Sequence, residues 1–193
     1  MAEVEEYLIL KQLTDVLDSL DIRYAIGGSI ASSVYGTVRF TQDADINVAA
    51  FSDKAEGFHE AVERDFYISK EAMHQAISKH SSFNVIHLAA AFKIDIFVRA
   101  DEDFDRQLFL RRNKVKLDES LDHLFDVVSA EDIILLKLQW YEASGGSSDR
   151  QWSDALGIIA VQGNSLDMEY LRAYSERLGL GDILRKAIQE SQT

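Results

Sequence analysis

Residues 24–48 constrain the fold more than any other stretch, because they place a strand, a glycine turn, a helix and a pair of carboxylates in close succession. Apolar residues alternate with polar or small ones up to Ile26, which predicts a strand. Gly27 and Gly28 then interrupt it, and Ser29 stands where a helix would begin. Backbone N–H groups at such a helix start are free to bind phosphate oxygens. We therefore expect an α/β chain with an anion site directly after its first strand.

Two carboxylates follow in Asp43-Ala44-Asp45, at the start of a second apolar run. Residues two apart on a strand share a face, so Asp43 and Asp45 project together. Carboxylates that share one spot repel each other, and a divalent cation relieves that repulsion. Carboxylates that also meet substrate phosphates are typical ligands of Mg²⁺. We therefore expect Asp43 and Asp45 to bind Mg²⁺ or Mn²⁺.

A third carboxylate, Asp95, lies in the middle of the apolar segment 92–98. An Asp in such a strand is costly to bury unless it is paired or bound to a metal. If this strand lies beside that of Asp43 and Asp45, three carboxylates converge on a two-metal site. One ion would bind a triphosphate and the other, about 3.5–4 Å away, would activate an attacking hydroxyl. The alternative is that the three residues are scattered surface acids.

The remaining periodicity predicts a mixed α/β half, 1–128, followed by a helical half, 129–193, in a fold with a small mixed sheet flanked by helices. Ser129 and Asp132 fit a capping box at the start of a helix. The expected helices span 3–20, 54–64, 69–79, 130–143, 149–161, 166–178 and 181–190, and the expected later strands span 83–88, 92–98, 112–117 and 125–128.

Composition narrows the possible functions. The chain has 193 residues, with 33 acidic and 20 basic side chains and no cysteine. It therefore has no disulfide, thiol nucleophile or cysteine-based zinc site, which fits the cytoplasm. A net charge of −13 argues against a broad nucleic-acid surface. The acidic start lacks the basic region of a secretory signal, and no uncharged apolar run approaches the roughly 18 residues of a membrane span.

One basic segment, 106–116, contrasts with this acidic background. Its five cationic residues favour either of two interpretations. The segment could hold an RNA end or another phosphate-bearing substrate. Alternatively, it is an edge strand whose lysines prevent pairing with other chains.

The order of these motifs resembles that in the nucleotidyltransferase superfamily, which includes DNA polymerase beta. The motifs are Gly28-Ser29, then, after thirteen intervening residues, Asp43-Ala44-Asp45-Ile46, and finally Asp95 on a later strand. Within it, the chain is most similar to the minimal and AbiEii-like enzymes, some of which are toxins of toxin–antitoxin systems. The resemblance covers roughly residues 20–160 and extends to the helical segment around Lys137 and to Asp154.

This resemblance implies that Lys137 approaches the nucleotide phosphates and that Asp154 meets Lys137 or the nucleotide. From the residues alone, Lys137 could instead extend to solvent from an apolar helix face, and Asp154 could pair with Arg150 four residues earlier. Gly27, Gly28 and Ser29 complete the expected nucleotide-binding set.

The expected activity is transfer of a nucleoside monophosphate from an NTP to an acceptor hydroxyl, with release of pyrophosphate. Gly28 and Ser29 would hold the β- and γ-phosphates, Asp43 and Asp45 would bind both metals, and Asp95 would complete the second metal site and help deprotonate the acceptor. The acceptor would be an RNA end or a small hydroxylated molecule, and a protein antitoxin is a possible partner. The alternative function is a non-catalytic nucleotide-binding or toxin–antitoxin partner protein on the same fold.

Overall fold

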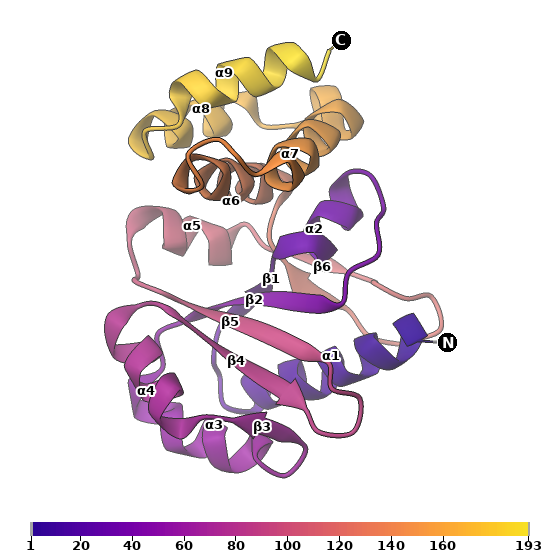
Figure 1. The fold of residues 1–193 in the computed structure, drawn as a ribbon, viewed down its shortest axis with the longest axis vertical. Helices are drawn as coiled ribbons and strands as arrows, with labels where there is room; N and C mark the ends of the chain where they lie inside the picture. Colours follow the sequence, from indigo (N-terminus) through magenta and orange to yellow (C-terminus); the bar gives the residue numbers. More distant parts are fainter. Residues whose placement is uncertain (1, 193) are drawn as a thin grey trace. The chain divides into compact units, whose positions relative to one another are not determined.

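The computed structural model describes residues 2–192, with side chains from Glu5 onward. Contacts between Cα atoms divide these residues into two compact units. The first comprises the described residues up to Gly27 together with Thr41–Val127, and the second comprises Gly28–Phe40 and the chain from Val128 onward. Figure 1 shows the elements of both units.

The first unit contains a mixed sheet of seven strands, counted over the described residues, in the order β3-β4-β5-β2-β1-β7-β6. The β2/β5 and β1/β7 pairs are parallel and the other pairs are antiparallel. The strands are β1 (Tyr24–Ile26), β2 (Asp43–Ala49), β3 (Phe66–Ile68), β4 (Ser82–His87), β5 (Lys93–Arg99), β6 (Asn113–Val115) and β7 (Phe125–Val127). The helices are α1 (Ala2–Ser19), α3 (Ala55–Val62), preceded by a 3₁₀ turn at Ser52–Lys54, α4 (Lys70–Lys79) and α5 (Asp103–Leu110).

The two faces of this sheet differ in chemistry because side chains alternate along each strand. On β2, Ala44, Ile46 and Val48 are completely buried, and the alternating apolar residues of β5 are buried on the same face. The helices α1, α3 and α4 lie on this apolar side of the sheet, and α5 lies on the other (Figure 1). The polar residues of β2 and β5 therefore share the face opposite the main core.

Two elements of the first unit were not expected from the sequence. Helix α5 begins with a capping box between Glu102 and Asp105, and Phe104 and Leu108, four residues apart, bury its apolar side. Strand β3 has only three residues, too few to show an alternating pattern. The expected strand 112–117 is present as the shorter β6.

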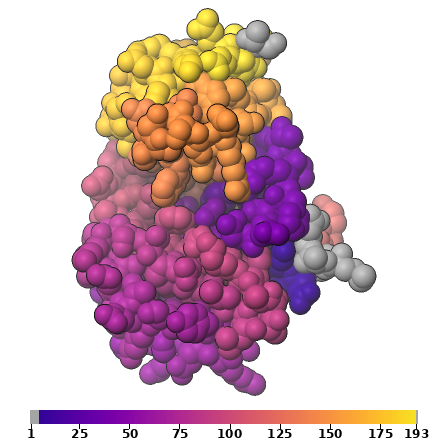
Figure 2. All heavy atoms as spheres, viewed as in Figure 1, coloured from indigo at the N-terminus to yellow at the C-terminus, as the bar shows by residue number. Residues whose placement is uncertain are grey.

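The second unit is helical. Its helices are α2 (Gly28–Tyr35), α6 (Ala130–Ala143), α7 (Asp149–Gln162), α8 (Met168–Arg177) and α9 (Gly181–Glu190), with a 3₁₀ turn at Gly163–Ser165. Helix α6 is its centre and contacts α2, α7 and α8. Figure 2 shows the side chains of α7, in orange, against those of α9, in yellow.

Helix α6 confirms the expected helix over 130–143. Its Ser129 cap is also confirmed, since the Ser129 hydroxyl accepts a hydrogen bond from the Asp132 N–H at 3.1 Å. Every residue from Ala130 to Leu138 is buried. Because residues 130–138 of this helix are buried on all sides, a charged lysine within this stretch needs a partner of opposite charge.

These elements confirm the expected α/β fold with a mixed sheet and flanking helices. Over the described part of the chain, no helix combines the length and the apolar character needed to cross a lipid bilayer.

Candidate functional site

The three predicted carboxylates lie on two adjacent strands of the first unit. Strand β2 carries Asp43 and Asp45, and β5 runs parallel beside it with Asp95 directly opposite Asp45. Paired residues on neighbouring strands point to the same side of a sheet, and Asp43, two residues earlier, shares that side. All three are partly buried on the polar face. The structure therefore places on one face of the sheet the three carboxylates that the sequence singled out.

Lys93 lies among these carboxylates. It stands opposite Asp43 in the strand register, and its Nζ is 2.7 Å from the carboxylate of Asp95. The hydrogen bond to Asp95 raises the pKa of the Lys93 ammonium group, and the charges of Asp43 and Asp45 act in the same direction. Thr41 donates a hydrogen bond to the Asp43 carboxylate at 2.9 Å. The face is therefore a network of fixed charges and not a row of unrelated surface acids.

The carboxylates are suitable ligands for Mg²⁺ or Mn²⁺, which bind oxygen donors. The same-face arrangement of Asp43, Asp45 and Asp95 supplies those donors from two rigid strands. Within residues 2–192, however, no three acidic or histidine side chains already converge closely enough to hold an ion. Asp95 is engaged with Lys93 instead. A metal bound by all three residues would therefore require Asp95 to exchange this partner.

Gly27 supports β2 from the neighbouring chain segment. Its N–H donates to the backbone oxygen of Asp45 at 2.8 Å. A Cβ atom at this position would lie 2.8 Å from Nδ2 of Asn47, which itself donates to the Ala25 carbonyl. Arg99 donates to Oδ1 of the same Asn47 through Nε at 2.8 Å. The glycine is thus required by packing beside the carboxylate strand.

Asn47 and Arg99 had no assigned role in the sequence analysis. The available indication was their spacing, because Asn47 lies two residues beyond Asp45 and Arg99 lies four beyond Asp95. Both therefore fall on the polar face of their strands. Their bond joins the two strands at the end away from Asp43.

The second unit holds a separate group of charged side chains, formed by Ser29, Arg39, Lys137, Arg150 and Asp154, which we call the cation cluster. Lys137 Nζ lies 2.8 Å from the Asp154 carboxylate, and both side chains are almost completely buried. Arg39 binds the same carboxylate with two nitrogens, each at 3.0 Å. Lys137 is therefore a buried, paired lysine and does not extend to solvent.

Ser29 accepts hydrogen bonds from the other side of this cluster. Arg150 Nη2 donates to the Ser29 hydroxyl at 2.8 Å, and Arg39 Nη2 donates to it as well. Arg150 thus contacts Ser29, while Asp154 pairs with Lys137 and Arg39. Gly28, with φ of +55°, begins the helix in a conformation that favours glycine. The cluster gathers three cationic groups and one carboxylate at the start of α2.

Asp154 is held in its ionised form by this arrangement. Burial alone would raise its pKa, but hydrogen bonds from Arg39 and Lys137 outweigh burial and hold the pKa below the ordinary 3.8. Beside Arg39 and Asp154 lies a small cavity of about 150 Å³, which Ser32, Thr37, Ser153 and Gly157 complete. Hydroxyl and guanidinium groups therefore line space that a polar ligand group can enter.

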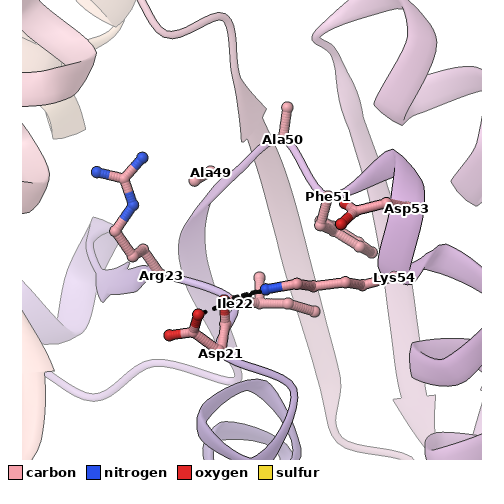
Figure 3. Close-up of a pocket in the computed structure, with 8 residues that line it drawn as sticks. All are labelled: Asp21, Ile22, Arg23, Ala49, Ala50, Phe51, Asp53 and Lys54. Atoms are coloured by element: carbon pink, nitrogen blue, oxygen red, sulfur yellow. Dashed lines mark hydrogen bonds and ion pairs between the residues drawn. The ribbon is translucent and has the colours of Figure 1, made fainter.

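A larger cavity, of about 290 Å³, lies in the first unit where β1 begins and β2 ends. Figure 3 shows Lys54 extending to Asp21, with Arg23 pointing away from both. Lys54 donates to the Asp21 carbonyl at 2.6 Å. None of the predicted site residues lines this cavity.

The basic segment 106–116 is largely committed to contacts within the first unit. Arg112 Nε and Lys114 Nζ each lie 3.0 Å from the buried carboxylate of Asp126. Strand β6, which carries Lys114, is at one end of the strand order. These contacts favour the edge-strand interpretation over a surface reserved for RNA.

No protein-family model matches the chain, and no curated protein sequence matches it. Solved structures do match. The antibiotic-resistance factor ANT(2'')-Ia in solution is 13% identical, with 96% of this chain and 99% of that chain covered and a TM-score of 0.58.

Two further structures agree with this match. ANT(2'')-Ia in complex with adenylyl-2''-tobramycin is 14% identical, with 90% of this chain and 98% of that chain covered and a TM-score of 0.59. An antigenic nucleotidyltransferase-like protein from Paracoccidioides brasiliensis is 17% identical, with 97% and 91% covered and a TM-score of 0.54. At these identities the likeness establishes the fold, and the chain has the nucleotidyltransferase fold.

The cation cluster generates a prediction about stability. Replacement of Asp154 by Asn leaves the buried Lys137 and Arg39 without their carboxylate and should lower the free energy of unfolding at pH 7 by about 3 kcal/mol. The folded-state pKa of Asp154 is depressed, so its contribution is fully present above the ordinary value of 3.8 and is lost as the pH falls through the folded pKa. The difference between wild type and variant should therefore be constant from pH 5 to 8 and narrow below about pH 4.

Urea unfolding across this pH range measures the effect. The exposed Asp149, in the first turn of α7, provides a matched control, and Asp149→Asn should change stability by less than about 0.5 kcal/mol. Equal stabilities of wild type and Asp154→Asn at pH 7 would contradict this account of the cluster.

Proposed function

We propose that this chain is a metal-dependent nucleotidyltransferase, which moves a nucleoside monophosphate from an NTP to an acceptor hydroxyl and releases pyrophosphate. The observation that carries the proposal is the register of β2 and β5, which sets Asp45 opposite Asp95 with Asp43 on the same face. Carboxylates arranged in this way on a nucleotidyltransferase fold are suited to divalent ions and a triphosphate.

The three carboxylates divide two roles in the proposal. Asp43 and Asp45 would hold both divalent metals, and Asp95 would complete the second metal site and accept the proton of the acceptor hydroxyl. A bound divalent cation supplies Lewis acidity and neutralises charge on the phosphoryl group. The protein contributes mainly position and fixed charge, since phosphoryl-type transfer requires little covalent participation from the enzyme.

The cation cluster is assigned to the phosphates. Ser29 lies in the first turn of helix α2, where free N–H groups favour an anion, and Arg39 and Arg150 direct their guanidinium groups to its hydroxyl. Lys137 adds a third cation held in place by Asp154. In this proposal Asp154 is a positioning residue, because it orders the cations without contacting the nucleotide. Gly27 contributes by packing, and Gly28 by allowing the turn into the helix.

A small, cationic, hydroxylated molecule is the proposed acceptor. ANT(2'')-Ia, which shares the fold, is described in complex with adenylyl-2''-tobramycin, an adenylylated aminoglycoside. The net charge of −13 attracts cationic acceptors and repels RNA. In the basic segment 106–116, Arg112 and Lys114 pair with Asp126. These observations favour a small molecule over the RNA end or antitoxin partner implied by the AbiEii-like resemblance.

The proposed mechanism predicts the effect of removing one ligand charge. Asp43→Asn and Asp45→Asn should each reduce transfer of a labelled nucleotide by at least about 100-fold, because the metal would lose an anionic ligand. The circular dichroism spectrum and unfolding midpoint should stay close to wild type, since both side chains lie outside the apolar core. The matched control is Asp53→Asn, an exposed acid of the same unit, which should retain transfer. Full transfer by either site variant would exclude this mechanism.

The acceptor assignment is tested separately. A labelled NTP is incubated with total tRNA and with a panel of aminoglycosides, and binding of each acceptor is measured between 50 and 200 mM salt. We expect label on an aminoglycoside, and no RNA binding that weakens steeply with salt. RNA labelling together with about a 10³-fold or greater salt-dependent loss of RNA affinity would replace this acceptor with RNA.

A further inference from the structure

The pairing of Lys93 with Asp95 has a consequence for metal binding that goes beyond the proposed transfer reaction and rests on it. Lys93 is the second residue before Asp95 on the same strand, so both side chains are on the polar face. Its Nζ is 2.7 Å from Oδ2 of Asp95 and lies across from Asp43 in the register. The ammonium group of Lys93 is therefore already bound to Asp95, one of the carboxylates that the proposed metal would need.

The ammonium group and a divalent cation cannot both bind the same carboxylate oxygen at close range, because their charges repel. Lys93 is bonded to Oδ2 of Asp95, so repulsion between the two cations favours withdrawal of Lys93 when a metal binds this carboxylate. The Lys93 side chain is 41% exposed, whereas that of Asp95 is 23% exposed. Lys93 thus has access to solvent and a flexible four-carbon chain with which to withdraw, while Asp95 is fixed on a central strand.

We propose that Lys93 is a positioning residue that occupies Asp95 before metal binds, is displaced from it by the incoming divalent cation, and so weakens the affinity of the site for free metal. The carboxylates are then never left to repel one another without a cation. A metal ion that arrives with a triphosphate brings additional ligands that offset the cost of displacing Lys93. Metal entry is thereby favoured together with the nucleotide.

The simpler alternative is an ordinary surface ion pair that only adds to the stability of the sheet. Such a pair exists in the same unit between Lys70 and Glu56, at 2.5 Å, with both side chains more than half exposed. Lys70→Met removes the same charge by the same substitution at a position outside the carboxylate face. It is therefore the matched control for Lys93→Met.

The test is a titration of Mn²⁺ without nucleotide, in which free Mn²⁺ is followed by electron paramagnetic resonance at low ionic strength. Lys93→Met should bind Mn²⁺ about fivefold more tightly than wild type, as expected for removal of one partly exposed competing charge. Lys93→Arg, which keeps the charge, and Lys70→Met should remain within about twofold of wild type. Circular dichroism and unfolding of each variant establish that it is folded.

A double-mutant cycle tests whether the gain in Mn²⁺ affinity caused by Lys93→Met depends on the carboxylate of Asp95. In an Asp95→Asn background, Lys93→Met should give less than about a twofold gain, because the carboxylate for which the two cations compete is absent. The same gain in both backgrounds would overturn the displacement, as would Mn²⁺ binding by Lys93→Met that equals or falls below that of wild type. These results would leave the metal site of the proposed function intact. If neither wild type nor Lys93→Met binds Mn²⁺ without nucleotide, the role of Lys93 is overturned, and the metal site of the proposed function is decided by the metal titration with NTP present.

Discussion

The parallel pairing of β2 with β5 is the interaction on which the proposed chemistry depends. It aligns Asp45 with Asp95 and, on the opposite face, joins two rows of buried aliphatic residues. A shift of one residue in either strand would move its carboxylates into the core and its aliphatic side chains to the polar face. Hydrophobic burial under α1, α3 and α4 therefore fixes the register that the carboxylates need. The stability of the core and the geometry of the site have the same physical origin.

Charge compensation is the second theme, and it takes opposite forms in the two units. In the first unit a single lysine lies among carboxylates, and Lys93 forms an ion pair with Asp95. In the second unit a single carboxylate lies among cations, and Asp154 forms ion pairs with Lys137 and Arg39. In each case one residue of the opposite sign lowers the cost of bringing like charges together before a ligand arrives. In the proposed function, metal at the first group and phosphate at the second would supply the remaining counter-charge.

Much of the fold and part of the candidate site could be predicted from sequence because they follow from local periodicity. Alternation along 43–48 and 92–98 separated the Asp residues from the core, and the cap at Ser129 located the start of α6. The sequence alone could not show that the strand of Asp43 and Asp45 pairs with the strand of Asp95, so their adjacency remained an assumption until the structure was known. The contact of Arg39 with Asp154 joins residues 115 positions apart, and no local pattern specifies it. Likewise, Lys93 was visible beside Asp95, but its commitment to that carboxylate depends on side-chain geometry.

The most direct test of the central claim is titration calorimetry of each of the four NTPs in the presence of Mg²⁺ or Mn²⁺, comparing wild type with the double variant Asp43→Asn/Asp45→Asn. The account predicts that at least one NTP binds to the wild type only when the metal is present, and that this heat is absent in the folded double variant. Binding of no NTP by the wild type, or equal metal-dependent binding by the double variant, would contradict the assignment of these carboxylates to a metal–nucleotide site.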